Sequence, residues 1–165
     1  MGSAGFPNSI VSYMMLFLHE FGHFIVFTCL FLAVNFLFFG RFSSKNYLIG
    51  LFATILIDLD HLIDYFIYHG FYFDLLGFLQ GDNFELNQKA YVFFHSWELV
   101  IAIFMVYVLF EQKNKKISSY ILMIVLGLTA HISYDVVTYD IAWGGYFLYN
   151  RMVNAFDILV LEGVY

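Results

Sequence analysis

The chain has 165 residues, of which 62% are hydrophobic and 22% aromatic, while only 12% are charged. An ordinary soluble domain is close to half apolar, so a soluble fold of this size could not bury so much apolar surface. Its 7 Lys and Arg residues are few and unclustered, which excludes a nucleic-acid-binding surface. The composition therefore predicts one integral membrane domain over residues 1–165.

Four apolar stretches are long enough to cross a bilayer as helices, because about 20 residues suffice. Short polar segments separate them, and the stretches cover approximately residues 10–39, 47–68, 90–110 and 117–138. Between the second and third stretch, residues 71–79 predict a short helix lying in the membrane interface, and the tail from residue 141 predicts an interfacial cap. We therefore expect an all-α fold, an integral membrane four-helix bundle with short interfacial helices.

The basic residues predict the orientation of this bundle. Arg41 and Lys45 lie in the first loop, and Lys113, Lys115 and Lys116 lie in the third. In a protein with four spans these loops share one side, which the positive-inside rule assigns to the cytoplasm. We therefore expect a multi-pass protein of the cell membrane with both termini outside.

The ionisable side chains inside the apolar stretches are all potential metal ligands, and no Lys or Arg accompanies them. Ionisable groups at membrane depth are costly and usually functional. Because the chain offers no opposite charge in these stretches, we expect a bound cation as their partner. The residues are His19, Glu20, His23, Asp58, Asp60, His61, Asp64, His95, Glu98, His131 and Asp135.

The spacing of these residues predicts that they converge. Residues three or four apart share a helix face, as in the pairs His19/His23, His95/Glu98 and His131/Asp135. Helices of alternating direction would bring all the groups to one level near the outer end of the bundle. The predicted metal site therefore faces the extracytoplasmic side.

Imidazole and carboxylate ligands suit zinc, and also manganese or iron. The predicted ligands outnumber those that one closed tetrahedral site needs, which favours two ions, or one ion with supporting residues. Glu20 and Glu98 are adjacent to ligands and are the predicted general bases. The predicted ligands are His19, His23, Asp58, Asp60, His61, Asp64, His95, His131 and Asp135.

The segment His19-Glu20-Phe21-Gly22-His23 matches H-E-x-x-H, in which two His bind zinc and Glu serves as base. In an apolar helix this motif resembles intramembrane zinc metalloproteases. The Asn-Pro-Asp-Gly or Leu-Asp-Gly segment that supplies the third ligand of those proteases is absent from the sequence. The resemblance also leaves the ligands of the other three helices without a role.

A second resemblance covers most of the chain and rests on four ordered motifs, which are Gly22-His23, Asp58-Leu59-Asp60-His61, His95-Ser96 and His131-Ile132-Ser133-Tyr134-Asp135. They resemble motifs of the LexA-regulated, membrane-bound metal-dependent hydrolases of bacterial inner membranes, which are distantly similar to zinc-dependent phospholipase C. The resemblance implies a metal site in the inner membrane that is built from His23, Asp58, Asp60, His61, His95, His131 and Asp135.

The chain departs from the pattern of that family at two places. Ile57 stands where the family has Pro, and the family's His-Arg-Gly before the third motif is replaced by Ala90, Tyr91 and Val92. Losing that Arg removes a contact suited to a phosphate group.

Together these observations predict a membrane-embedded metal-dependent hydrolase. A metal-activated water would attack an ester or phosphodiester of a lipid or lipid-linked substrate. Two alternatives remain open: an intramembrane zinc metalloprotease that uses His19, Glu20 and His23, and a non-enzymatic protein that handles metal ions or protons.

Overall fold

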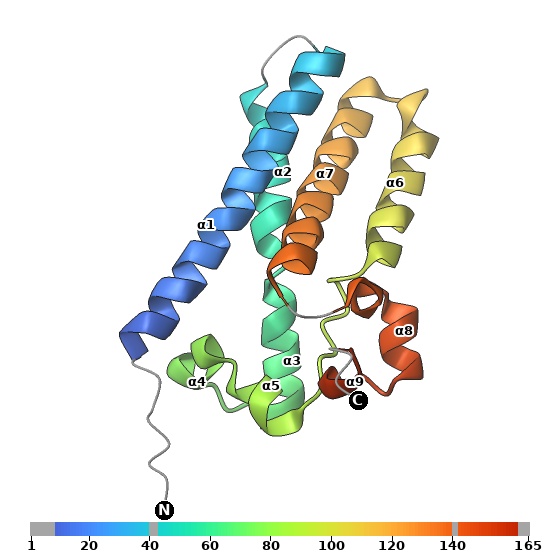
Figure 1. Ribbon diagram of the computed structural model, residues 1–165. Coiled ribbons are helices and arrows are strands. Elements are labelled where there is room, and N and C mark those ends of the chain that lie inside the picture. Colours follow the sequence, from blue (N-terminus) through green and yellow to red (C-terminus); the bar gives the residue numbers. More distant parts are fainter. Residues whose placement is uncertain (1–8, 40–42, 140–141, 162–165) are drawn as a thin grey trace, which may run out of the picture.

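The computed structural model describes residues 9–39, 43–139 and 142–161, which fold into helices joined by short turns (Figure 1). Arg41, which contributed to the predicted orientation, lies outside the described residues. Within the described ranges there is no β-strand, and the only extended pairing is an isolated bridge between Lys89 and Asp157. The all-α prediction is confirmed for these ranges.

The helical elements follow one another with few residues between them. In chain order they are α1 (Ser9–Val34), the π-helix η1 (Asn35–Phe39), α2 (Ser44–Leu56), α3 (Leu59–His69), α4 (Leu75–Gln80), α5 (Asp82–Asn87), α6 (Trp97–Glu111), α7 (Lys115–Thr138), the 3-10 helix η2 (Trp143–Tyr146), α8 (Leu148–Val153) and α9 (Ile158–Leu161).

Among the described residues, three helical segments are long and apolar enough to cross a membrane: Leu16–Phe38, Ser44–His69 and Lys115–Thr138. They coincide with the first, second and fourth predicted spans. These segments are typical of a membrane protein, because a run of more than about 18 apolar residues is longer than a buried helix of a soluble domain needs.

The third predicted span differs from the structure. Residues 90–96 are not helical, and α6 begins at Trp97, where the Ser96 hydroxyl accepts a hydrogen bond from the backbone N–H of Leu99. α6 has 15 residues, and at 1.5 Å per residue it measures about 22 Å, less than the hydrocarbon core of a bilayer. The expectation that His95 and Glu98 share a helix face is wrong, since His95 precedes the helix.

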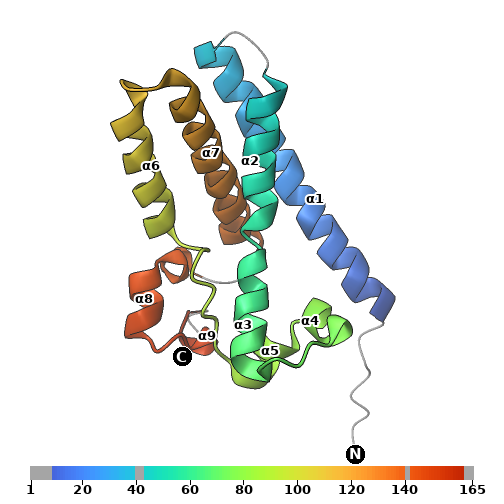
Figure 2. The same ribbon diagram turned by 180° about the vertical axis from the view of Figure 1, so that it is seen from behind.

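α7 is the central helix and packs against α1, α2 and α6 (Figures 1 and 2). Its contact with α2 is close because two glycines meet there: a Cβ atom on Gly127 would overlap the carbonyl oxygen of Gly50. Phe27 of α1 and Met123 of α7 are buried in the core beside this contact. The close approach fixes the position of α7 relative to α2.

α2 and α3 form one membrane-length segment that is interrupted at Ile57 and Asp58. At the interruption the backbone N–H of Asp58 bonds the carbonyl of Ile55, three residues back, at 3.3 Å. The carbonyl of Thr54 is thereby left for a partner outside the helix. α3 continues beyond the end of α7, so the interruption lies at the level where α7 ends and α6 begins (Figure 1).

Candidate metal centre

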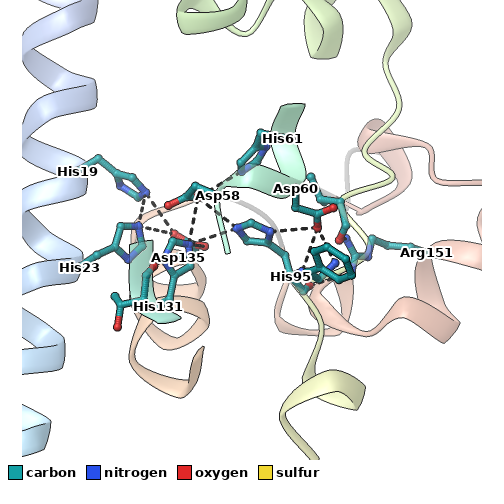
Figure 3. A network of polar contacts seen from close by, with 12 residues as sticks. His19, His23, Asp58, Asp60, His61, His95, His131, Asp135 and Arg151 are labelled. Atoms are coloured by element: carbon teal, nitrogen blue, oxygen red, sulfur yellow. Dashed lines mark hydrogen bonds and ion pairs between the residues drawn. The ribbon is translucent and has the colours of Figure 1, made fainter. Parts of the chain in front are cut away.

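Seven of the predicted ligands come together at the interruption between α2 and α3 (Figure 3). α1 contributes two of them, the α2–α3 segment two, the segment before α6 one and α7 two. We call this set the metal-binding cluster; it consists of His19, His23, Asp58, His61, His95, His131 and Asp135.

The first group in the cluster lies between α1 and α7. The Nε2 atoms of His19 and His23 each lie 3.2 Å from Oδ1 of Asp135, and they are 2.9 Å from each other. A tetrahedral zinc ion with bonds of about 2.0 Å separates its ligand atoms by about 3.3 Å. The three atoms therefore have the spacing of one face of a tetrahedral site.

The second group surrounds Nε2 of His131. This atom lies 3.2 Å from Nε2 of His95 and 3.4 Å from Oδ1 of Asp58, and the last two atoms are also 3.4 Å apart. Nε2 of His61 approaches the same Asp58 oxygen to 3.6 Å, and Oδ2 of Asp135 lies 3.2 Å from Nε2 of His131. Asp135 therefore faces the first group with one oxygen and the second group with the other.

Two imidazoles of the second group are oriented by contacts of their Nδ1 atoms. Nδ1 of His131 donates to the free carbonyl of Thr54 at 2.7 Å, which leaves the Nε2 lone pair of a neutral ring directed into the cluster. Nδ1 of His95 faces Oδ2 of Asp60 at 3.4 Å. Metal-binding His residues usually bond their second nitrogen to a carbonyl or carboxylate in this way, because the bond fixes the tautomer and the ring orientation.

Asp60 and Asp64, both predicted as ligands, lie outside the ligand groups found among the described residues. Asp60 is fully buried, and its Oδ2 also accepts hydrogen bonds from the backbone N–H groups of Phe94 and His95. Oδ1 of Asp64 accepts from the N–H of Tyr91 at 3.3 Å. Both carboxylates therefore hold the segment that carries His95.

The two predicted bases lie in different places. The Glu98 carboxylate accepts hydrogen bonds from the N–H groups of Leu148 and Tyr149 at 2.9 and 3.0 Å, so it caps α8 and does not face the cluster. Glu20 is exposed on α1 and lines a cavity together with His19 and other cluster residues. Only Glu20 therefore has the placement that the base prediction requires.

Arg151 of α8 is a site residue that the sequence analysis missed. Its side chain is buried, and the guanidinium donates to the carbonyls of Val92 and His95 at 2.6 and 2.8 Å (Figure 3). Burial lowers the pKa of Arg151, whereas neighbouring carboxylates, with Asp60 first, favour its charged form. In the sequence Arg151 stands out because no other Lys or Arg follows Lys116.

Two cavities of about 520 Å³ each adjoin the cluster. One lies beside α8 and α9 and includes His95 and Arg151 in its lining, and the other lies between α1 and α3 and includes Glu20. Both are lined mainly by apolar side chains, and both are bordered by Asp135 and Tyr139. Burial and the negative charge of Asp135 raise the pKa of Tyr139, so its phenol remains a hydrogen-bond donor at neutral pH.

Comparisons with protein-family profiles, with characterised proteins and with solved structures found no match for this chain.

Proposed function

We propose that the chain is a membrane-embedded metal-dependent hydrolase that acts on a lipid or lipid-linked ester or phosphodiester. The observation that supports this most is the convergence of imidazole Nε2 atoms and carboxylates beside two largely apolar cavities. The cluster offers cation ligands, and the cavities offer space for a hydrophobic substrate.

The donor set fits a divalent cation. The Nδ1 atoms of His131 and His95 face acceptors, so in the tautomer that binds metal both Nε2 atoms, which are 3.2 Å apart, face each other beside the carboxylates of Asp58 and Asp135. A divalent cation would accept both Nε2 lone pairs and would balance the charge of the carboxylates. Zinc suits this mixture best, followed by manganese or iron. When bound, such an ion supplies Lewis acidity and an activated water.

Two residues of the chain are placed to act on a substrate beside this centre. Glu20 lines the cavity between α1 and α3 without belonging to a ligand group among the described residues, so its carboxylate is the proposed general base. Tyr139 borders both cavities, and its protonated phenol is the proposed donor to a carbonyl or phosphoryl oxygen.

The cavity between α1 and α3 supports a lipid substrate. Leu16, Leu59 and Leu62 line it, and all three belong to segments of membrane-crossing length. Hydrocarbon of a bilayer would therefore adjoin the cavity, and an acyl or prenyl chain could reach the centre without passing through water.

The proposed setting is the inner membrane, with the centre near the extracytoplasmic side. The turn between α6 and α7 carries Lys113 and the adjoining Lys115, and it lies at the opposite end of α7 from His131 and Asp135 (Figure 1). The positive-inside rule assigns that end to the cytoplasm. In this arrangement α6 and the segment before it complete a four-helix bundle with the three long segments.

A second candidate, an intramembrane metalloprotease, is favoured by one observation. Asp135 of α7 offers a third ligand atom to the His19 and His23 pair, although the segment that supplies this ligand in such proteases is absent from the sequence. A protease of this kind would depend on Glu20 and tolerate the loss of His95, whereas the proposed hydrolase requires both groups of the cluster.

The test uses protein purified in detergent, reloaded with zinc and assayed on short-chain esters, phosphodiesters and a panel of labelled membrane lipids. We expect His131→Ala to bind less metal and to lose activity, and Glu20→Gln to keep metal but lose at least about 100-fold in rate. His69→Ala is the matched control, because His69 stacks on Tyr65 and belongs to no ligand group among the described residues.

Absence of hydrolysis of every lipid, ester and phosphodiester by zinc-loaded protein would overturn the hydrolase proposal. Cleavage of transmembrane peptides that survives His95→Ala would support the protease.

A further inference from the structure

We infer that the cluster is a two-ion centre in which the Asp135 carboxylate is shared, with one ion on the α1 side and one on the side of α3 and His95. The inference rests on the metal binding of the proposed function but not on hydrolysis.

The first argument is the direction of the two Asp135 oxygens. Oδ1 lies 3.2 Å from the Nε2 atoms of both His19 and His23, whereas Oδ2 lies 3.2 Å from Nε2 of His131. A carboxylate that presents each oxygen to a different group of ligands is suited to bridge two cations. If an ion bound only one oxygen of Asp135, the other oxygen would face imidazole nitrogens with no cation between them.

The second argument is that each group has the ligands for its own ion. His19, His23 and Oδ1 of Asp135 have mutual distances of 2.9 to 3.2 Å, and His95, His131 and Asp58 have distances of 3.2 to 3.4 Å. Each triangle matches one face of a tetrahedron of ligands around a zinc ion, for which the edge is about 3.3 Å. Each triangle therefore has the ligand spacing for an ion of its own.

The third argument is the surplus of ligands on the side of α3. His61 approaches Asp58 but lies on the far side of it from the first group (Figure 3). With Asp135 Oδ2 it brings the second group to five candidate ligand atoms, while the first group has three. The α1 ion therefore has the more open coordination, and it is the ion next to Glu20.

The experiment measures bound metal per chain by mass spectrometry after chelation, reloading with zinc and removal of free ions. We expect two equivalents in the unmodified protein and in the His69→Ala control. The double variants His19→Gln/His23→Gln and His95→Gln/Asp58→Asn should each retain one equivalent, and Asp135→Asn should retain less than the unmodified protein.

A second measurement replaces zinc with manganese and records the electron paramagnetic resonance spectrum. Two ions that share a carboxylate give an exchange-coupled spectrum, and either double variant should convert it into the six-line spectrum of an isolated ion. This readout does not depend on catalysis, and circular dichroism identifies variants that fail to fold.

One equivalent in the unmodified protein, or loss of all metal in both folded double variants, would overturn the two-ion assignment. Two coupled ions without hydrolysis of any substrate would refute the proposed function and leave the assignment intact. Hydrolysis by a protein that holds a single ion would refute the two-ion assignment and leave the proposed function intact.

Discussion

Arg151 supports the centre through backbone carbonyls and touches none of the predicted ligand atoms. Its two hydrogen bonds hold the carbonyls of Val92 and His95, and the N–H of His95 bonds Asp60 on the other side. The ring of His95 is therefore positioned by two buried charges of opposite sign. Without the guanidinium, the two buried carbonyls would lose their hydrogen-bond donor, which is destabilising.

We predict that Arg151→Met lowers the free energy of unfolding by roughly 3 kcal/mol and weakens zinc binding about 10-fold or more, because His95 loses its support. Thermal unfolding in detergent and competition with a chelator measure the two effects. The control is Lys115→Met, since Lys115 is exposed at the start of α7. Unchanged zinc affinity in Arg151→Met would contradict a positioning role.

Glu98 is a structural carboxylate, whereas Glu20 is the candidate for catalysis. We predict that Glu98→Ala costs about 1–2 kcal/mol of stability, because two N–H groups at the start of α8 lose their acceptor. Metal content should remain at the unmodified value, as it should in Glu20→Gln. Loss of bound zinc in a folded Glu98→Ala protein would show that this carboxylate contributes to the centre after all.

At the scale of the elements, the contact between α2 and α7 determines where His131 meets Thr54. We predict that Gly127→Val destabilises the protein by at least about 2 kcal/mol and lowers zinc affinity, because the added atoms overlap Gly50 and push the helices apart. Ala102→Val is the control, since Ala102 lies on the exposed face of α6. Equal melting temperatures for the two variants would contradict this account of the packing.

Hydropathy is sufficient to predict the long segments, because a membrane-crossing helix needs only a continuous apolar run. It cannot predict the start of α6, since Ala90 to Phe94 are as apolar as the helix that follows. The segment stays non-helical because distant side chains bond its backbone: Asp64 bonds Tyr91, Asp60 bonds Phe94 and Arg151 bonds Val92. Such long-range bonds leave no periodic signal in the sequence.

The interruption between α2 and α3 was also not predicted from the sequence. In Asp58-Leu59-Asp60-His61 the two acids look equivalent by spacing, and both were predicted as ligands. Residues two apart do not share a helix face, so Asp58 enters the cluster and Asp60 lies behind His95. By contrast, His19/His23 and His131/Asp135 lie within continuous helices, where a spacing of four is enough to place both side chains on one face.

At the scale of the whole molecule, the cluster joins four segments that are also held together by apolar packing and by the hydrogen bonds of Asp60, Asp64 and Arg151. We predict that removing the metal with a chelator lowers the melting temperature and that zinc restores it, since a ligand at 100 times its dissociation constant adds about 2.7 kcal/mol. Differential scanning fluorimetry in detergent measures the shift. The His131→Ala variant should show a smaller shift, because only the group of His19, His23 and Asp135 remains intact, and a shift of the same size in that variant would refute the prediction.

The distribution of the ligands along the chain also has a consequence for biosynthesis. His19 emerges from the ribosome long before Asp135, and no earlier portion of the polypeptide contains the complete coordination sphere. With the proposed centre in a bilayer, the first hairpin would integrate into the lipid phase while its acids are still protonated or hydrated. Metal capture would then be the last event of maturation, and a cell starved of the ion would accumulate a fully translated precursor exposed to quality-control proteases.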